Sequence, residues 1–97
     1  MGAPPRDDDN SFLLPVDGCL DLHAFAPRDA CSVVEEYLRE CRRRGILEVR
    51  VVHGKGTGFQ RRAVRELLQG LDFVESVRNA PGDAGGWGAT MVRLSRG

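Results

Sequence analysis

Apolar residues alternate or recur at helical spacing along most of the chain, and this pattern predicts the first elements. In residues 18–25, apolar Leu20 and Leu22 alternate with polar neighbours, which predicts a half-buried strand. Apolar residues then recur at helical spacing over about 27–44, and Gly45 is a typical C-terminal stop for such a helix. The chain therefore opens its ordered part with a strand followed by a helix.

The second half repeats the alternation of strand and helix and then adds one more strand. Residues 46–53 alternate like the first strand, and residues 59–69 have an apolar helical face. Residues 71–79 and 88–94 again have strand character, with the glycine-rich stretch Pro81–Gly86 between them. The predicted order is β-α-β-α-β-β.

This order predicts the topology. Two β-α-β crossovers make the first three strands parallel, and right-handed crossovers place both helices on the same sheet face. Alternating rather than continuous apolar strands indicate that the other sheet face is open. A hairpin joins the last two strands, so the fourth strand is antiparallel. We therefore predict a two-layer α/β sandwich with a mixed four-stranded sheet.

Composition and charge narrow the class of protein. The 97 residues suit one domain, and 14 basic residues balance 14 acidic ones, so global charge indicates no membrane or nucleic-acid partner. No apolar run is long enough to span a membrane, and the first residues lack the pattern of a secretory signal. We expect residues 1–15 to be a disordered acidic leader and residues 16–97 to form one domain, monomeric and cytoplasmic.

Three cysteines, with spacings of 12 and 10 residues, match no zinc pattern. We expect them to be reduced, buried thiols. A two-metal hydrolase is also disfavoured, because few carboxylates accompany Asp21. No metal site is predicted, and no cofactor is required.

Candidate chemistry gathers where the parallel strands end, because their carboxyl ends share one edge of the sheet. Asp21 and His23 are two apart in the first predicted strand, so they would project from one face about 6.6 Å apart. A carboxylate can orient an imidazole for general acid–base work. The alternative is that both are ordinary solvated residues of the open face.

A glycine-rich loop follows the second strand at the same edge. Three glycines let the backbone turn its N–H groups toward an anion, and the loop opens a helix, whose N-terminus favours negative charge. A tight turn that needs glycine for its own geometry is the alternative, since the loop is neither a P-loop nor a dinucleotide fingerprint. We predict phosphate binding by residues Gly54, Lys55, Gly56, Thr57 and Gly58.

Other residues at this edge are candidates as well. His53 has the parity of buried residues, but its place at the strand end argues against deep burial. Arg61 and Arg62, with Arg65, are predicted to face outward from the helix, where they either form a solvated face or, since they follow the anion loop directly, extend a phosphate track. Gly86 and Trp87 begin the approach to the last strand, where Trp87 either stacks on a base or joins the core.

The residues Leu20–His23, His53–Gly58 and Gly85–Thr90 resemble the three signatures of the Smr (small MutS-related) domain family, in order, across about 16–95. The resemblance, to the short stand-alone type, implies a fold similar to the C-terminal domain of bacterial translation initiation factor three. It also implies nucleic-acid binding and, in several members, endonuclease activity. One departure is Ala24, where the family usually has glycine, and it weakens the case for catalysis.

The leading hypothesis is an endonuclease that cleaves phosphodiester bonds. His23, supported by Asp21, would carry protons, with His53 as its complement. Two histidines favour RNA slightly, because its 2′-hydroxyl is a built-in nucleophile; on DNA, Asp21 would recruit a divalent metal. The alternative is a non-catalytic module that binds nucleic acid or a ribosome-like partner. A third hypothesis is a small domain that binds a phosphate-bearing ligand or another protein.

Overall fold

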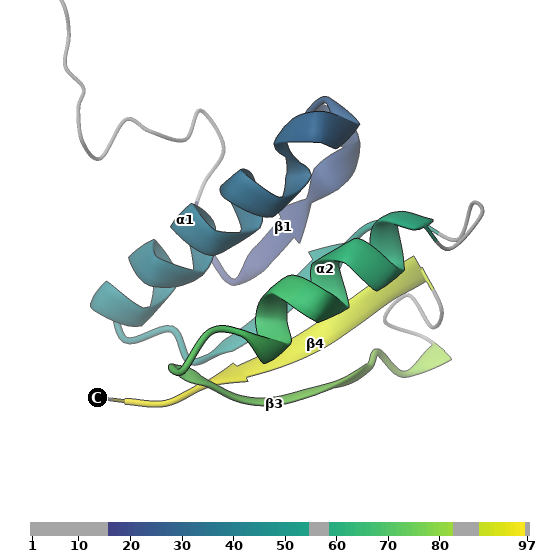
Figure 1. Ribbon diagram of the computed structural model, residues 1–97. Helices are drawn as coiled ribbons and strands as arrows, with labels where there is room; N and C mark the ends of the chain where they lie inside the picture. Colours follow the sequence, from purple (N-terminus) through teal and green to yellow (C-terminus); the bar gives the residue numbers. More distant parts are fainter. Residues whose placement is uncertain (1–15, 55–58, 83–87, 97) are drawn as a thin grey trace, which may run out of the picture.

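The computed structural model describes residues 16–54, 59–82 and 88–96 (Figure 1). The predicted leader, residues 1–15, lies outside the described residues. The predicted element order is found, with two short 3-10 turns added before the first long helix. The elements are β1 (Cys19–Asp21), the 3-10 turns η2 (Leu22–Ala24) and η3 (Pro27–Asp29), α1 (Ala30–Arg43), β2 (Glu48–Val52), α2 (Phe59–Gln69), β3 (Val74–Asn79) and β4 (Ala89–Leu94).

The predicted fold class is confirmed, and the structure adds the strand order β1-β2-β4-β3. β1 and β2 are parallel, whereas β4 is antiparallel to both β2 and β3. β4 therefore lies between β2 and β3. The physical reason is burial: most side chains of β4 are buried, whereas none of β3 is fully buried. The more apolar strand takes the interior position, and the more polar one forms an edge.

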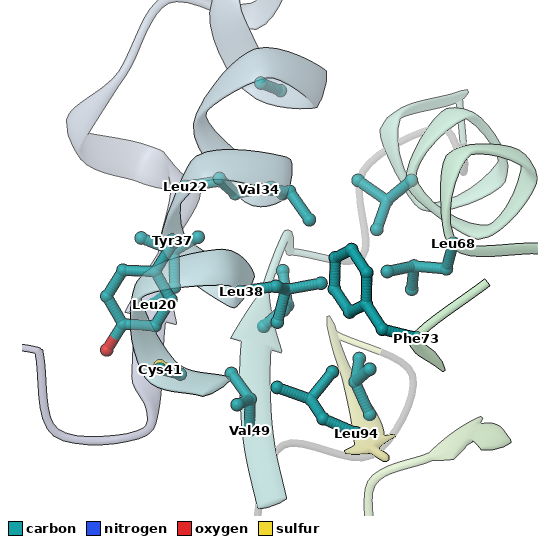
Figure 2. Close-up of a cluster of buried hydrophobic side chains, with 14 residues drawn as sticks. Leu20, Leu22, Val34, Tyr37, Leu38, Cys41, Val49, Leu68, Phe73 and Leu94 are labelled. Atoms are coloured by element: carbon teal, nitrogen blue, oxygen red, sulfur yellow. The ribbon is translucent and has the colours of Figure 1, made fainter. Parts of the chain in front are cut away.

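Both helices lie on one face of the sheet, side by side (Figure 1). The core fills the space between them and the sheet (Figure 2). Tyr37 and Leu38 of α1 meet Leu20 and Val49 of the sheet there, all fully buried. The opposite face carries the polar residues of the strands, among them Arg50 and Arg78, as the alternating pattern predicted.

Helix α1 ends as its sequence predicts. Gly45 has φ +81, the left-handed conformation that glycine adopts readily. The N–H of Gly45 donates to the Arg42 carbonyl, and that of Ile46 donates to the Cys41 carbonyl. These two bonds form a Schellman motif, which satisfies the last carbonyls of the helix.

The three cysteines are free thiols, as expected. Only Cys41 is buried, however, and burial raises the pKa of its thiol to about 11. The expectation of buried thiols is wrong for Cys19, which is exposed on the open face, and Cys31 is half-buried. Among the residues that the structure describes, no helix has the length and apolar character needed to cross a membrane.

Candidate functional site

Asp21 and His23 meet, but in a different local structure from the predicted strand. β1 ends at Asp21, and Leu22–Ala24 form a 3-10 turn. Asp21 caps this turn, because its Oδ1 accepts the backbone N–H of His23 at 2.9 Å. The expectation of a continuous strand with a 6.6 Å offset is therefore wrong. The cap brings Asp21 Oδ1 to 2.7 Å from Nδ1 of His23, a direct hydrogen bond.

The charge of Asp21 fixes the orientation of the imidazole. The backbone and side-chain hydrogen bonds from His23 lower the pKa of Asp21, so its carboxyl is ionised near neutral pH. Because a carboxylate only accepts, Nδ1 of His23 carries the hydrogen of this bond. Nε2 then remains for exchange with a ligand. The His23 side chain is 66% exposed, which leaves the ring accessible from solvent.

Gly54, the first residue of the predicted phosphate loop, lies against His23. Its φ is +81, and a Cβ built on it would lie 3.0 Å from Nε2 of His23. This distance is tighter than nine in ten real Cβ contacts, so the imidazole would have to shift by a few tenths of an ångström. Glycine is therefore required here both by the backbone conformation and by the approach of the imidazole. The first two predicted signatures meet at this contact.

His53 is deeply buried, so the expectation based on its place at the strand end is wrong. It is 4% exposed, on the helix side of the sheet. Its Nδ1 donates to the Gly54 carbonyl at 2.9 Å, and its Nε2 accepts from the Thr90 hydroxyl at 2.8 Å. Burial, and then the charges of Arg61 and Arg65, lower its pKa, so the ring is neutral at pH 7. Both nitrogens are used within the protein.

The third signature joins the second through the backbone. The Gly88 carbonyl accepts the N–H groups of both His53 and Gly54, each at 2.9 Å. Thr90, two residues later, is fully buried and holds the His53 ring. Segments from the ends of β1 and β2 and the start of β4 are thus tied together around Gly54, as the sequence predicted for one edge of the sheet.

Two arginines of α2 converge beside this centre rather than facing outward. Arg61 and Arg65 both donate to Asn79 Oδ1 of β3, at 2.7 and 2.5 Å, and are half-buried. Arg62 alone of the three is exposed, as predicted. Two neighbouring guanidinium groups make this corner positive, which suits a phosphate. Sequence reasoning named Arg65 with Arg61 and Arg62 but missed Asn79, the partner of Arg61 and Arg65, and it placed Gly88 and Thr90 in the third signature without giving them a role.

The remaining site predictions concern residues outside the described ranges. Phosphate binding was predicted for Lys55, Gly56, Thr57, Gly58, Gly86 and Trp87, all of which lie there. Within residues 16–54, 59–82 and 88–96, no group of three or more histidine, cysteine, aspartate or glutamate side chains is placed to hold a metal ion.

Comparison with known proteins decides the family. The family model of the Smr domain matches residues 20–95, nearly all of the described chain. This chain belongs to the Smr domain family. The match covers the Asp21–His23 pair, Gly54 and the Gly88–Thr90 segment, so the residues brought together in the structure lie inside it.

Relatives and solved structures agree with this assignment. The Smr domain is 41% identical over 75 residues to Endonuclease MutS2 of Thermus thermophilus and 36% identical over 85 residues to Endonuclease MutS2 of Clostridium botulinum. These matches cover 77% and 88% of this chain but only 10% and 11% of those proteins. The chain thus spans about a tenth of the length of these relatives.

Among solved structures, the Smr domain of Thermus thermophilus MutS2 superposes with a TM-score of 0.75 at 40% identity, covering 80% of this chain and 98% of that one. YdaL, a stand-alone small MutS-related protein from Escherichia coli, gives a TM-score of 0.69 at 25% identity, covering 80% of this chain and 64% of that one. The fold described above is therefore that of the Smr domain.

The buried Thr90 hydroxyl holds the His53 ring by a hydrogen bond, and this bond leads to a stability prediction. We expect Thr90→Val to lower the free energy of unfolding by about 1–3 kcal/mol, because it leaves the buried Nε2 of His53 without its donor. Urea denaturation measures this loss. Thr90→Ser keeps the hydroxyl and is the matched control. A valine variant as stable as the serine variant would contradict the role of this hydrogen bond.

Burial of neutral His53 gives the Smr domain a dependence of stability on pH. In the unfolded chain this imidazole takes up a proton as the pH falls through about 6.5, whereas its lowered pKa keeps it neutral in the folded state. The unfolded state then binds more protons, so the free energy of unfolding falls as the pH drops below about 6.5. Urea denaturation at pH 7.5 to 5 should show this decline, and His53→Gln should flatten it. An unchanged slope in His53→Gln would contradict the assignment.

Proposed function

We propose that this Smr domain binds nucleic acid and cleaves its phosphodiester bonds. The observation that carries the proposal is the accessible imidazole of His23, oriented by ionised Asp21 and seated on the backbone of Gly54. An oriented imidazole with one exchangeable nitrogen is suited to general acid–base catalysis. The name endonuclease, which the MutS2 relatives carry, supports the same chemistry.

In the proposed reaction the scissile phosphate lies beside Gly54, near the positive corner formed by Arg61 and Arg65. On RNA, Nε2 of His23 takes the proton of the 2′-hydroxyl as the 2′ oxygen forms its bond to phosphorus. The bond from phosphorus to the 5′ oxygen breaks, and that oxygen takes a proton from water. The two guanidinium groups stabilise the charge that develops on the phosphate oxygens. We expect Lys55 and the glycines after it, with Arg62 and Trp87, to add contacts to the strand.

His53 takes a different part in this proposal from the one first expected. Both of its nitrogens bond within the protein, and it is neutral and buried. It therefore serves as a positioning residue that fixes Gly54 through the Gly54 carbonyl. Of the two histidines, only His23 transfers protons in this proposal.

RNA is the favoured substrate, because its own hydroxyl supplies the nucleophile. On DNA the attacking group would be water, and Asp21 would be the carboxylate that recruits a divalent metal. Its Oδ1 already accepts two hydrogen bonds from His23, which makes the carboxylate a less available ligand. This occupation of Asp21 supports RNA over DNA.

Ala24 no longer weakens the case for catalysis. It lies at the exposed end of the 3-10 turn, and among the described residues no residue other than glycine has a positive φ. Alanine therefore fits this position without strain. The alternative of a non-catalytic binding module thereby loses one of the two observations that motivated it, and the open sheet face remains in its favour.

The test is a cleavage assay with end-labelled single-stranded RNA and supercoiled plasmid, each in EDTA or in magnesium. We expect RNA cleavage that survives EDTA and is lost in His23→Ala, a variant at an exposed position that should leave the fold intact. Plasmid nicking that requires magnesium would instead favour DNA. Equal residual cleavage by wild type and His23→Ala would mean contamination and would overturn the nuclease proposal in favour of the binding module.

A further inference from the structure

A second cluster of cations lies at the other end of the molecule. Four arginines line an open groove of about 530 Å³: Arg39, Arg42, Arg43 and Arg96. We call this the arginine groove. It is formed by the last turns of α1 and the segment that follows β4, which meet where Nε of Arg42 donates to the Ser95 carbonyl. A space of this size admits a phosphate with its sugar.

The groove is built around an aromatic ring rather than from freely moving side chains. The guanidinium carbons of Arg39 and Arg42 lie 4.9 and 5.3 Å from the centroid of the Phe73 ring. Phe73 is only 5% exposed and packs against the core (Figure 2). Arg42 is also held through Nε, which donates to the Ser95 carbonyl at 3.0 Å. Two guanidinium groups are thus fixed against one ring, in a favourable cation–π geometry.

Carboxylates balance only part of this charge. Arg39 pairs with Glu35, and Arg43 pairs with Glu40, which Arg44 also contacts. Within residues 16–54, 59–82 and 88–96, no ion pair joins Arg42 or Arg96 to a carboxylate. Like charges held together repel, and an anion between them relieves this repulsion. Planar guanidinium groups bind phosphate oxygens in pairs, so phosphate is the anion that fits best.

We infer that the arginine groove is a second contact for the backbone of the same nucleic acid, outside the cleavage centre; this inference rests on the proposed function. α1 begins near the site end of the fold and has 14 residues, so its last turn lies about 21 Å farther along. At about 3.4 Å per nucleotide in a helically stacked strand, and with fewer nucleotides in an extended one, at most about six phosphates separate the two contacts. The groove then holds long strands without reading their sequence, and short ones do not reach it.

The test compares a 20-nucleotide RNA with a 3-nucleotide RNA, binding being measured by fluorescence anisotropy over a range of salt concentrations. The variant is Arg43→Gln/Arg96→Gln, which leaves both arginines on Phe73 in place and so preserves packing. For the 20-mer we expect affinity about tenfold weaker at low salt and a salt slope smaller by about 1.4, the loss of two phosphate contacts. The 3-mer is too short to join the two contacts and should bind the variant and the wild type equally.

A matched control removes two positive charges elsewhere. Arg44→Gln/Arg78→Gln changes exposed arginines that do not line the groove, and it should alter 20-mer affinity much less. A second variant, Arg42→Gln, with its fold checked by thermal unfolding, tests the fixed guanidinium directly and should also weaken the 20-mer selectively.

The outcomes separate this inference from the proposed function. If the groove variants bind the 20-mer as tightly as wild type, with the same salt slope, the groove inference is wrong while cleavage at His23 stands. If both variants and the control weaken the 20-mer equally, only general charge is at work, which also overturns it. If the groove variants bind polyglutamate more weakly than wild type does but bind RNA equally well, the groove is a site for an acidic protein and the inference fails. If wild type binds no nucleic acid, the proposed function fails first.

Discussion

Replacing Gly54 with alanine is expected to lower the rate of RNA cleavage about tenfold. The added Cβ would lie 3.0 Å from Nε2 of His23, so the imidazole has to shift by a few tenths of an ångström from the position in which Asp21 holds it. A displacement of about 1 Å in a catalytic group costs about 100-fold, and this smaller shift costs less. Alanine at the positive φ of Gly54 also lowers the free energy of unfolding by about 1–2 kcal/mol, because its Cβ disfavours this backbone conformation. Single-turnover cleavage and urea denaturation measure the two effects separately.

Gly45 offers a matched control for the strain alone. It has the same φ, +81, but nothing lies within 4 Å of the Cβ that alanine would add. Gly45→Ala should therefore lose a similar amount of stability and keep its cleavage rate. If Gly45→Ala and Gly54→Ala lost activity equally, the loss would come from general destabilisation, and the contact between Gly54 and His23 would have no catalytic meaning.

The second large effect is expected from Asp21→Asn, which should lower the cleavage rate at least about 100-fold with little change in stability. Asparagine is as good a cap as aspartate, so the turn that presents His23 is kept. The change removes the negative charge that fixes the hydrogen on Nδ1 and stabilises the imidazolium during proton transfer. Single-turnover rates, with far-UV circular dichroism as the check on folding, measure the effect.

Cys19→Ser is the control for Asp21→Asn. Cys19 lies on the same strand and the same exposed face, two residues before Asp21, and its hydrogen bonds are with Asp17 and Arg50 rather than with His23. We expect wild-type cleavage from this variant. An Asp21→Asn protein that cleaves at the wild-type rate would show that the carboxylate serves only as a helix cap.

The elements of the fold follow from the sequence because apolar periodicity is strong in them. The predicted helix over 59–69 has the same bounds as α2, and Gly45 ends α1 as expected. The position of β4 between β2 and β3 did not follow from chain order, because a hairpin is compatible with either neighbour arrangement. The difference in burial between the two last strands, visible in the apolar Val92 and Leu94 against the polar β3, decides it.

The site was predicted in its location but not in its local geometry. Alternation cannot reveal that Asp21 caps a 3-10 turn, because a capping aspartate and a strand aspartate occupy the same place in the pattern. His53 looked accessible because it ends a strand, yet Thr90 from a distant segment encloses it. Arg65 turns inward for the same kind of reason, since its partner Asn79 belongs to another element. Contacts between distant segments, which periodicity does not contain, account for each difference.

The most direct test of the central claim, that a phosphodiester lies at the junction of Asp21, His23 and Gly54, is an NMR titration. A 6-nucleotide DNA, which lacks the 2′-hydroxyl, would be added to the ¹⁵N-labelled protein without magnesium, and backbone amide shifts followed. We predict the largest changes at residues 21–24, 53–54 and 88–90, where the three segments meet. Saturable changes confined to other residues, with these amides unmoved, would contradict it.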